Sequence, residues 1–136
     1  MRVRDFMTSV IITAEIETPV SEAIKLMAAE DIGSLIVTRG EVLEGIVTQR
    51  DIICARLLSD EVYSTLTLED IMASPVVTIS PDADLGQAVS VMDSTGKKYL
   101  PVIEGHDIIG IVTAADVIRI LARMKVIAAG VPDDED

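Results

Sequence analysis

The strongest constraint on this chain is an internal repeat, because a shift of 65 residues places one half of the sequence on the other. The best-matched stretch is Gly-Ile-Val-Thr at 45–48 with Asp51, which falls on residues 110–113 with Asp116. The alignment needs no insertion between residues 3 and 53. A chain that repeats itself at such a period builds one supersecondary unit twice.

Each copy predicts the same order of elements, β-α-β-β-α, after a short helical lead. In the first copy we expect a lead at 3–7, a strand at 10–13, a helix from 18, strands at 34–38 and 42–47, and a closing helix from 48. In the second copy we expect these elements at 68–72, 76–78, from 80, at 99–103, at 107–112 and from 113. The sequence therefore predicts an α/β (α+β) fold built from two tandem units.

The first long helix of each copy is predicted from its apolar spacing and from its start. Val20, Ala23, Ile24 and Met27 recur at intervals of three and four residues and therefore share one helix face. Thr18-Pro19 in the first copy and Ser80-Pro81 in the second place a hydroxyl before a proline. A hydroxyl cap followed by proline at the first helical position is typical of a helix start.

Three segments follow from the repeat. Residues 1–66 form the first repeat with its linker, residues 67–129 form the second, and residues 130–136 are an acidic tail that we expect to be disordered.

Composition excludes several classes of function. Hydrophobic residues make up 49% of the chain but aromatic residues only 2%, so aromatic platforms for stacked bases are lacking. The net charge of −12 repels a phosphate backbone, which argues against a nucleic-acid partner.

The chain is also expected to stay out of membranes and secretory routes. No apolar run approaches the roughly 18 residues that a spanning helix needs, and Arg119, Arg123 and Lys125 interrupt the most apolar late stretch. The first residues lead into no signal-peptide core. The single Cys54 cannot form an internal disulfide, and we expect it to be a small buried hydrophobe. These features favour a cytoplasmic protein.

Several motifs resemble repeats of the CBS domain family, the cystathionine β-synthase type. They are Gly-Ile-Val-Thr-x-x-Asp in both copies, the opening segment at 7–13, and Leu-Pro-Val at 100–102, and the resemblance spans residues 1–128. It implies that the two repeats pack sheet to sheet about a pseudo-twofold axis and leave two clefts between them. It also implies that these clefts bind adenosine-containing ligands and that the protein regulates a partner, without being an enzyme.

Thr48 and Asp51 allow two interpretations. Their spacing fits a capping box, in which Thr48 caps the helix and Asp51 accepts from the cap amide, and spacing alone favours this cap. The resemblance instead favours ribose binding, with Asp51 accepting from both ribose hydroxyls while Thr48 and the free helix amides meet phosphate. The same two interpretations apply to Thr113 and Asp116.

Lys97 and Lys98 precede the first hairpin strand of the second copy. They are either solvated lysines after a helix end or, as the resemblance implies, donors to phosphates held by Thr48 and Asp51. The matching residues of the first copy, Ile32 and Gly33, carry no charge. The two clefts should therefore differ, and the Asp116 cleft better suits a neutral nucleoside or stays empty.

The remaining candidate ligand residues are weaker. Arg50 lies in the first turn of its helix, where it serves phosphate or is a bare surface arginine. Thr13 and Thr78 end the opening strands, where packing is the first expectation and a base-edge contact the second. No cluster of His, Cys and carboxylates has metal-ligand spacing, and no nucleophile is paired with a base. We therefore expect no catalytic site and no metal site.

The expected function is ligand sensing by a tandem-repeat module. It would bind AMP, ADP, ATP or an S-adenosylmethionine-type ligand, require no cofactor, and act on a separate effector protein. The last helix is apolar on more than one face, at Ala115, Val117, Ile118, Ile120, Leu121, Met124 and Ile127, so we expect a homodimer through helices that include 113–128. The alternatives are a structural module with empty clefts and, more remotely, a nucleotide-processing enzyme.

Overall fold

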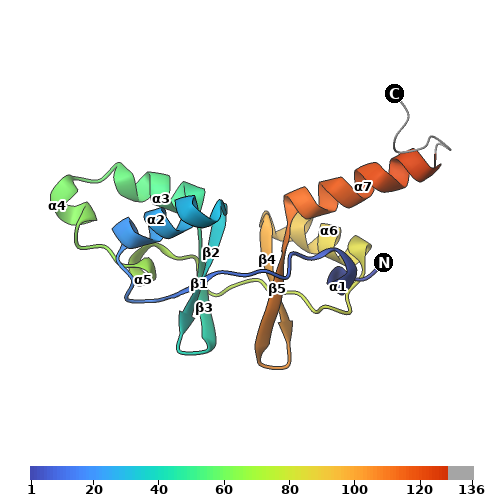
Figure 1. Ribbon diagram of the computed structural model, residues 1–136, viewed down its shortest axis with the longest axis horizontal. Helices are drawn as coiled ribbons and strands as arrows, with labels where there is room; N and C mark the ends of the chain where they lie inside the picture. Colours follow the sequence, from blue (N-terminus) through green and yellow to red (C-terminus); the bar gives the residue numbers. More distant parts are fainter. Residues whose placement is uncertain (129–136) are drawn as a thin grey trace. The chain divides into compact units, whose positions relative to one another are not determined.

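The computed structural model describes residues 1–128 of the chain (Figure 1). The helices are α1 (Val3–Phe6), α2 (Val20–Glu30), α3 (Gln49–Arg56), α4 (Asp60–Tyr63), α5 (Leu68–Ile71), α6 (Leu85–Thr95) and α7 (Ala114–Ala128). The strands are β1 (Thr13–Glu15), β2 (Ser34–Arg39), β3 (Val42–Thr48), β4 (Tyr99–Glu104) and β5 (Asp107–Thr113). The mixed α/β class is as predicted, and the first repeat has the predicted order of elements. The proposed acidic tail at 130–136 lies outside the described residues.

The chain forms two compact units that do not coincide with the two sequence repeats. One unit, the three-stranded unit, is Ile11–Val76. The other, the two-stranded unit, combines Met1–Val10 with the described part of the chain from residue 77 to residue 128. The short helical lead that opens each repeat therefore belongs to the unit that holds the sheet of the other repeat.

The sheet of the three-stranded unit has the order β1-β2-β3. Strand β1 pairs with β2 in parallel, and β2 and β3 form an antiparallel hairpin whose register shifts between Val37 and Thr38. Helix α2 buries Val20, Ala23 and Met27, which is the face that the sequence predicts. The carboxyl end of β3, at Thr48, is followed directly by the start of α3 at Gln49.

The opening strands differ from prediction in both repeats. In the first, the paired strand is Thr13–Glu15 rather than residues 10–13. In the second, residues 76–78 form no strand, and a single bridge joins Ile79 to Val102. The reason is Pro101, which lacks the N–H that its counterpart Ile36 donates to the Ile12 carbonyl.

The predicted starts of the long helices are also wrong. Helix α2 begins at Val20 with Pro19 itself as the N-cap, and the Thr18 side chain does not cap it. Helix α6 begins at Leu85, where the Asp84 side chain accepts from the Gln87 amide and Gln87 reaches back to the Asp84 amide. This reciprocal pair satisfies two free amides, so it fixes the helix start four residues after the predicted serine–proline pair.

The exchange of the two leads is visible in matching backbone hydrogen bonds. Thr8 and Ile111 exchange N–H···O bonds of 2.9 Å in both directions. Ala73 and Ile46 do the same at 2.9 and 3.1 Å, and these residues are the equivalents of Thr8 and Ile111 under the 65-residue shift. Figure 1 shows α1, in dark blue, beside α6 of the other repeat.

Each exchanged lead also enters a hydrophobic core. Val3 and Phe6 of α1 pack among the core residues of the two-stranded unit, where Val3 is fully buried. Leu68 of α5, also fully buried, packs in the core of the three-stranded unit. Burial of one such side chain contributes roughly 1.5–3 kcal/mol, so the leads are integral parts of the units they join.

A methionine of each lead lies directly over a glycine of the hairpin it packs against. A Cβ atom added to Gly45 would lie 2.9 Å from the Met72 Cβ atom, and one added to Gly110 would lie 2.6 Å from the Met7 Sδ atom. Side chains at either glycine position would therefore collide with the methionine. The glycines of the Gly-Ile-Val-Thr motif are required because another segment of chain crosses them.

Ion pairs at the two lead contacts have opposite polarity. In the three-stranded unit, Arg39 at the end of β2 pairs with Glu69 of α5 at 3.3 Å. At the equivalent place in the two-stranded unit, Glu104 pairs with Arg4 of α1 at 2.8 Å. If each lead packed on its own repeat instead, Arg4 would meet Arg39 and Glu69 would meet Glu104. The charges therefore favour the exchanged arrangement over the unexchanged one.

The glycine–methionine contact predicts a coupled effect on stability. Gly45→Ala should lower the free energy of unfolding by about 1–3 kcal/mol, as overpacking in a filled site does. In a Met72→Ala background the same substitution should cost less, because the colliding Sδ and Cγ atoms are gone and only the Cβ contact remains. Urea unfolding of the parent, both single variants and the double variant measures this coupling; additive costs would contradict the contact.

The reversed ion pairs predict a graded effect at position 69. Glu69→Gln removes one exposed pair and should cost roughly 0.2–1 kcal/mol, whereas Glu69→Arg should cost more because it faces Arg39 with a like charge. Adding Arg39→Glu to Glu69→Arg should recover part of the loss. The comparison is made by thermal unfolding at low and high salt, since screening should shrink all three differences. Equal costs for the Gln and Arg variants would show that charge at this contact is irrelevant.

Candidate functional site

The predicted site in the first repeat lies where β3 becomes α3. Thr48 is the last residue of β3 and the N-cap of α3, and Asp51 stands in the first helical turn. The Asp51 Oδ2 atom accepts from the Thr48 amide at 2.8 Å and from the Thr48 hydroxyl at 3.1 Å. The predicted capping box is therefore present, and the half-buried carboxylate stays in contact with solvent.

The equivalent site in the second repeat is more crowded. Asp116 Oδ2 accepts from the Thr113 amide at 3.0 Å, and the Thr113 hydroxyl accepts from the Asp116 amide at 3.1 Å. The Arg119 guanidinium donates to Asp116 Oδ1 at 3.1 Å. The Thr8 hydroxyl, from the exchanged lead, lies 3.4 and 3.3 Å from the two carboxylate oxygens. Neither Thr8 nor Arg119 was predicted as a partner of Asp116. The signal that could have indicated them is a difference between the repeats, because the 65-residue shift places these two residues opposite Ala73 and Cys54.

The basic candidates lie on exposed surface. Arg50 is exposed in the first turn of α3, beside Asp51 in the sequence. Lys97 and Lys98 are exposed between α6 and β4 in the two-stranded unit. The Lys98 carbonyl accepts from the Ala114 amide at 2.9 Å, which fixes its backbone beside the start of α7.

The threonines and the cysteine complete the set of predicted residues. Thr13 is the exposed first residue of β1, and Thr78 is exposed just before the Ile79 bridge. Cys54 is exposed on α3, so the prediction of a buried hydrophobe is wrong. The reason is that α3 turns Ala55 to the core, and its neighbour Cys54 therefore faces solvent.

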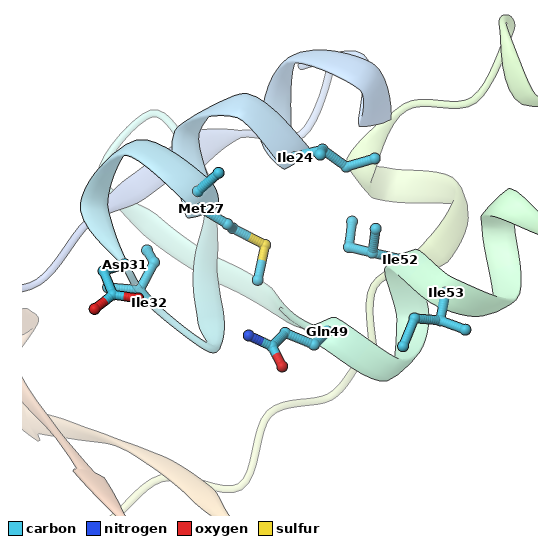
Figure 2. A pocket seen from close by; sticks show the side chains of 8 residues that line it. Ile24, Met27, Asp31, Ile32, Gln49, Ile52 and Ile53 are labelled. Carbon is cyan, nitrogen blue, oxygen red and sulfur yellow. The ribbon is translucent and has the colours of Figure 1, made fainter.

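Each unit also has an apolar hollow between its two long helices. The hollow between α2 and α3 has a volume of about 320 Å³, and Figure 2 shows Ile24 and Met27 of α2 directed toward Ile52 of α3. The hollow between α6 and α7 has a volume of about 410 Å³. Under the 65-residue shift its Val89, Met92, Val117 and Ile118 match the lining of the first hollow.

The part of the chain that the structure describes has neither a candidate metal centre nor a candidate membrane-spanning helix. Among residues 1–128, no group of three or more His, Cys, Asp or Glu side chains could hold a metal ion. Of the helices in this same part of the chain, none combines the length and apolarity that crossing a bilayer requires.

Known proteins are similar in sequence to this chain over most of its length. The inosine-5'-monophosphate dehydrogenase of Korarchaeum cryptofilum is 35% identical over 117 residues, which are 85% of this chain and 23% of the dehydrogenase. Two further curated relatives are covered over 20% and 54% of their length. The chain therefore spans between about a fifth and about a half of these relatives.

Solved structures match nearly the whole chain. A crystal structure of the CBS domain pair of protein MJ0100, in complex with 5'-methylthioadenosine and S-adenosyl-L-methionine, has a TM-score of 0.82 at 26% identity and covers 91% of this chain and 98% of that one. A crystal structure of CBSX2 in complex with AMP has a TM-score of 0.75, also at 26% identity, with the same coverage. The family profile of the CBS domain matches residues 3–57 and again 68–123. The chain thus belongs to the CBS domain family and carries two tandem CBS repeats.

Proposed function

We propose that this chain is a regulatory module that binds an adenosyl compound at Thr48 and Asp51 and acts in the cytoplasm, where adenine nucleotides are abundant. The observation that carries the proposal is the Thr48–Asp51 arrangement at the start of α3, which presents a carboxylate and a hydroxyl together in the first turn of a helix. Solved neighbours of the same fold, determined with 5'-methylthioadenosine, S-adenosyl-L-methionine or AMP bound, support this choice of ligand class.

The chemistry of the proposed site suits a ribose with a phosphate. A half-buried carboxylate such as Asp51 accepts strong hydrogen bonds from vicinal hydroxyls. The helix dipole at the start of α3 favours a phosphate, and Arg50 adds a positive charge in the same turn. In a chain of net charge −12, Lys97 and Lys98 are proposed to offset the negative charge of a phosphorylated ligand. Thr13 and Thr78 are proposed as secondary contacts.

Simple experiments can distinguish ligand sensing from two alternative functions, a structural module and a nucleotide-processing enzyme. A structural module with empty sites would carry no adenosyl compound after purification, whereas a sensor should release one when the protein is denatured for mass spectrometry. A nucleotide-processing enzyme would turn nucleotide over. The dehydrogenase similarity gives little support to an enzyme, because the matched segment is only 23% of that relative.

We further propose that two copies associate through their helices, and that a separate effector protein reads the ligand state. Ile118, Leu121 and Met124 on α7 are 66%, 46% and 39% exposed, whereas Val117 and Ile120 of the same helix are buried. Exposed apolar side chains gathered on one helix typically mark an interface. The side chain of Ile127, which completed the predicted surface, lies outside the described residues.

The proposed role of Lys98 predicts a ligand-dependent effect. Lys98→Ala should weaken AMP binding by about 1–3 kcal/mol, the cost of losing a charge-assisted contact, and should leave adenosine binding unchanged. Titration calorimetry with both compounds measures the difference. Lys25→Ala, at an exposed lysine of α2, is the matched control and should affect neither ligand. Equal losses for AMP and adenosine would remove Lys98 from the phosphate role.

The proposed dimer predicts an effect of charge on α7. Leu121→Asp and Ile118→Asp would each place a carboxylate in the interface and should shift the protein toward monomer in sedimentation velocity. Arg123→Glu, about 200° further around the helix than Leu121, is the control and should leave the mass unchanged. If the Asp variants fold and keep the parent mass, any dimer uses another surface.

A further inference from the structure

The two motif aspartates differ in how many of their oxygens are already used. Both oxygens of Asp116 accept hydrogen bonds, Oδ1 from Arg119 and Oδ2 from the Thr113 amide, with the Thr8 hydroxyl near both. Asp51 uses Oδ2 alone, for the Thr48 amide and hydroxyl. Within residues 1–128, Asp51 Oδ1 accepts no hydrogen bond, so it is available to a ligand.

The difference has an identifiable cause in the sequence. The residues that match Thr8 and Arg119 in the first repeat are Ala73 and Cys54. Alanine has no donor and a thiol is a weak one, so neither can replace the hydroxyl or the guanidinium. The backbone pairing of Ala73 with Ile46 repeats that of Thr8 with Ile111, so the two leads lie alike and only their side chains differ.

Burial separates the two carboxylates further. Asp116 is 3% exposed, whereas Asp51 is half-buried with solvent access. A ligand hydroxyl that approached Asp116 would have to displace the Arg119 guanidinium or the Thr8 hydroxyl. Displacing a charge-assisted hydrogen bond from a buried carboxylate offsets much of what the new contact would contribute.

We infer that the two CBS repeats have divided their roles, so that Asp51 holds the ligand while Asp116 is a structural acid. Asp116 fastens the exchanged lead, through Thr8, to the start of α7. The chain therefore binds one adenosyl ligand and not two. This inference rests on the proposed function for the identity of the ligand, but the structural role of Asp116 stands on its own contacts.

The experiment compares Asp51→Asn with Asp116→Asn in the full chain, using AMP as the probe. Calorimetry on the parent should give one AMP per chain. Asp51→Asn should weaken AMP binding about ten- to a hundredfold and move the ligand-free melting temperature by less than about 2 °C, because asparagine still accepts the Thr48 bonds. Asp116→Asn should lower the ligand-free melting temperature by about 5 °C or more and change AMP affinity less than about threefold, because its amide cannot accept from every donor around it.

A second variant keeps the test decisive if Asp116→Asn does not fold. Thr8→Val removes the hydroxyl at constant size, and it should lower the melting temperature with AMP affinity unchanged. Two AMP per parent chain would overturn the inference. So would an Asp116→Asn protein that melts like the parent, or one that loses AMP affinity as Asp51→Asn does.

If the proposed function is wrong, the same experiment gives a different result from the one that would overturn the role of Asp116. If the parent binds neither AMP nor S-adenosylmethionine, the ligand assignment is wrong. The two aspartate variants should then still melt at unequal temperatures, with Asp116→Asn the lower. Equal melting temperatures in that case would also overturn the structural role of Asp116.

Discussion

The packing of each helical lead on the sheet of the other repeat is the constraint on which this structure depends. Met72 over Gly45 and Met7 over Gly110 leave no room for a side chain at either glycine. The leads also supply buried residues to both cores, Val3 and Phe6 in one unit and Leu68 in the other. Neither repeat could therefore be completed without a segment of its neighbour.

The same exchange makes the two motif aspartates unequal. Because the lead of the first repeat crosses the hairpin of the second, Thr8 reaches Asp116. The lead of the second repeat places Ala73 at the corresponding position, with no donor to offer. The difference between Thr8 and Ala73 in the two leads, together with Arg119, thus distinguishes an occupied carboxylate from an available one.

Much of the local structure could be predicted, and the errors have physical causes. The two repeats, their hairpins and the capping box of Thr48 and Asp51 follow from patterns within a short stretch of chain. The strand expected at 76–78 is missing because Pro101, more than twenty residues away, cannot donate to it. The start of α6 was misplaced because the Asp84–Gln87 pair competes with the serine–proline signal and satisfies more amides.

By itself the sequence determined that one supersecondary unit occurs twice, in which order its elements run, and where its motif carboxylates stand. It could not determine which lead packs on which sheet, because a repeat makes the exchanged and unexchanged arrangements equivalent in their apolar contacts. Only the tertiary structure decided this, and with it the partners of Asp116. The reversed ion pairs, Arg39 with Glu69 and Glu104 with Arg4, break the equivalence, since the alternative would bring like charges together.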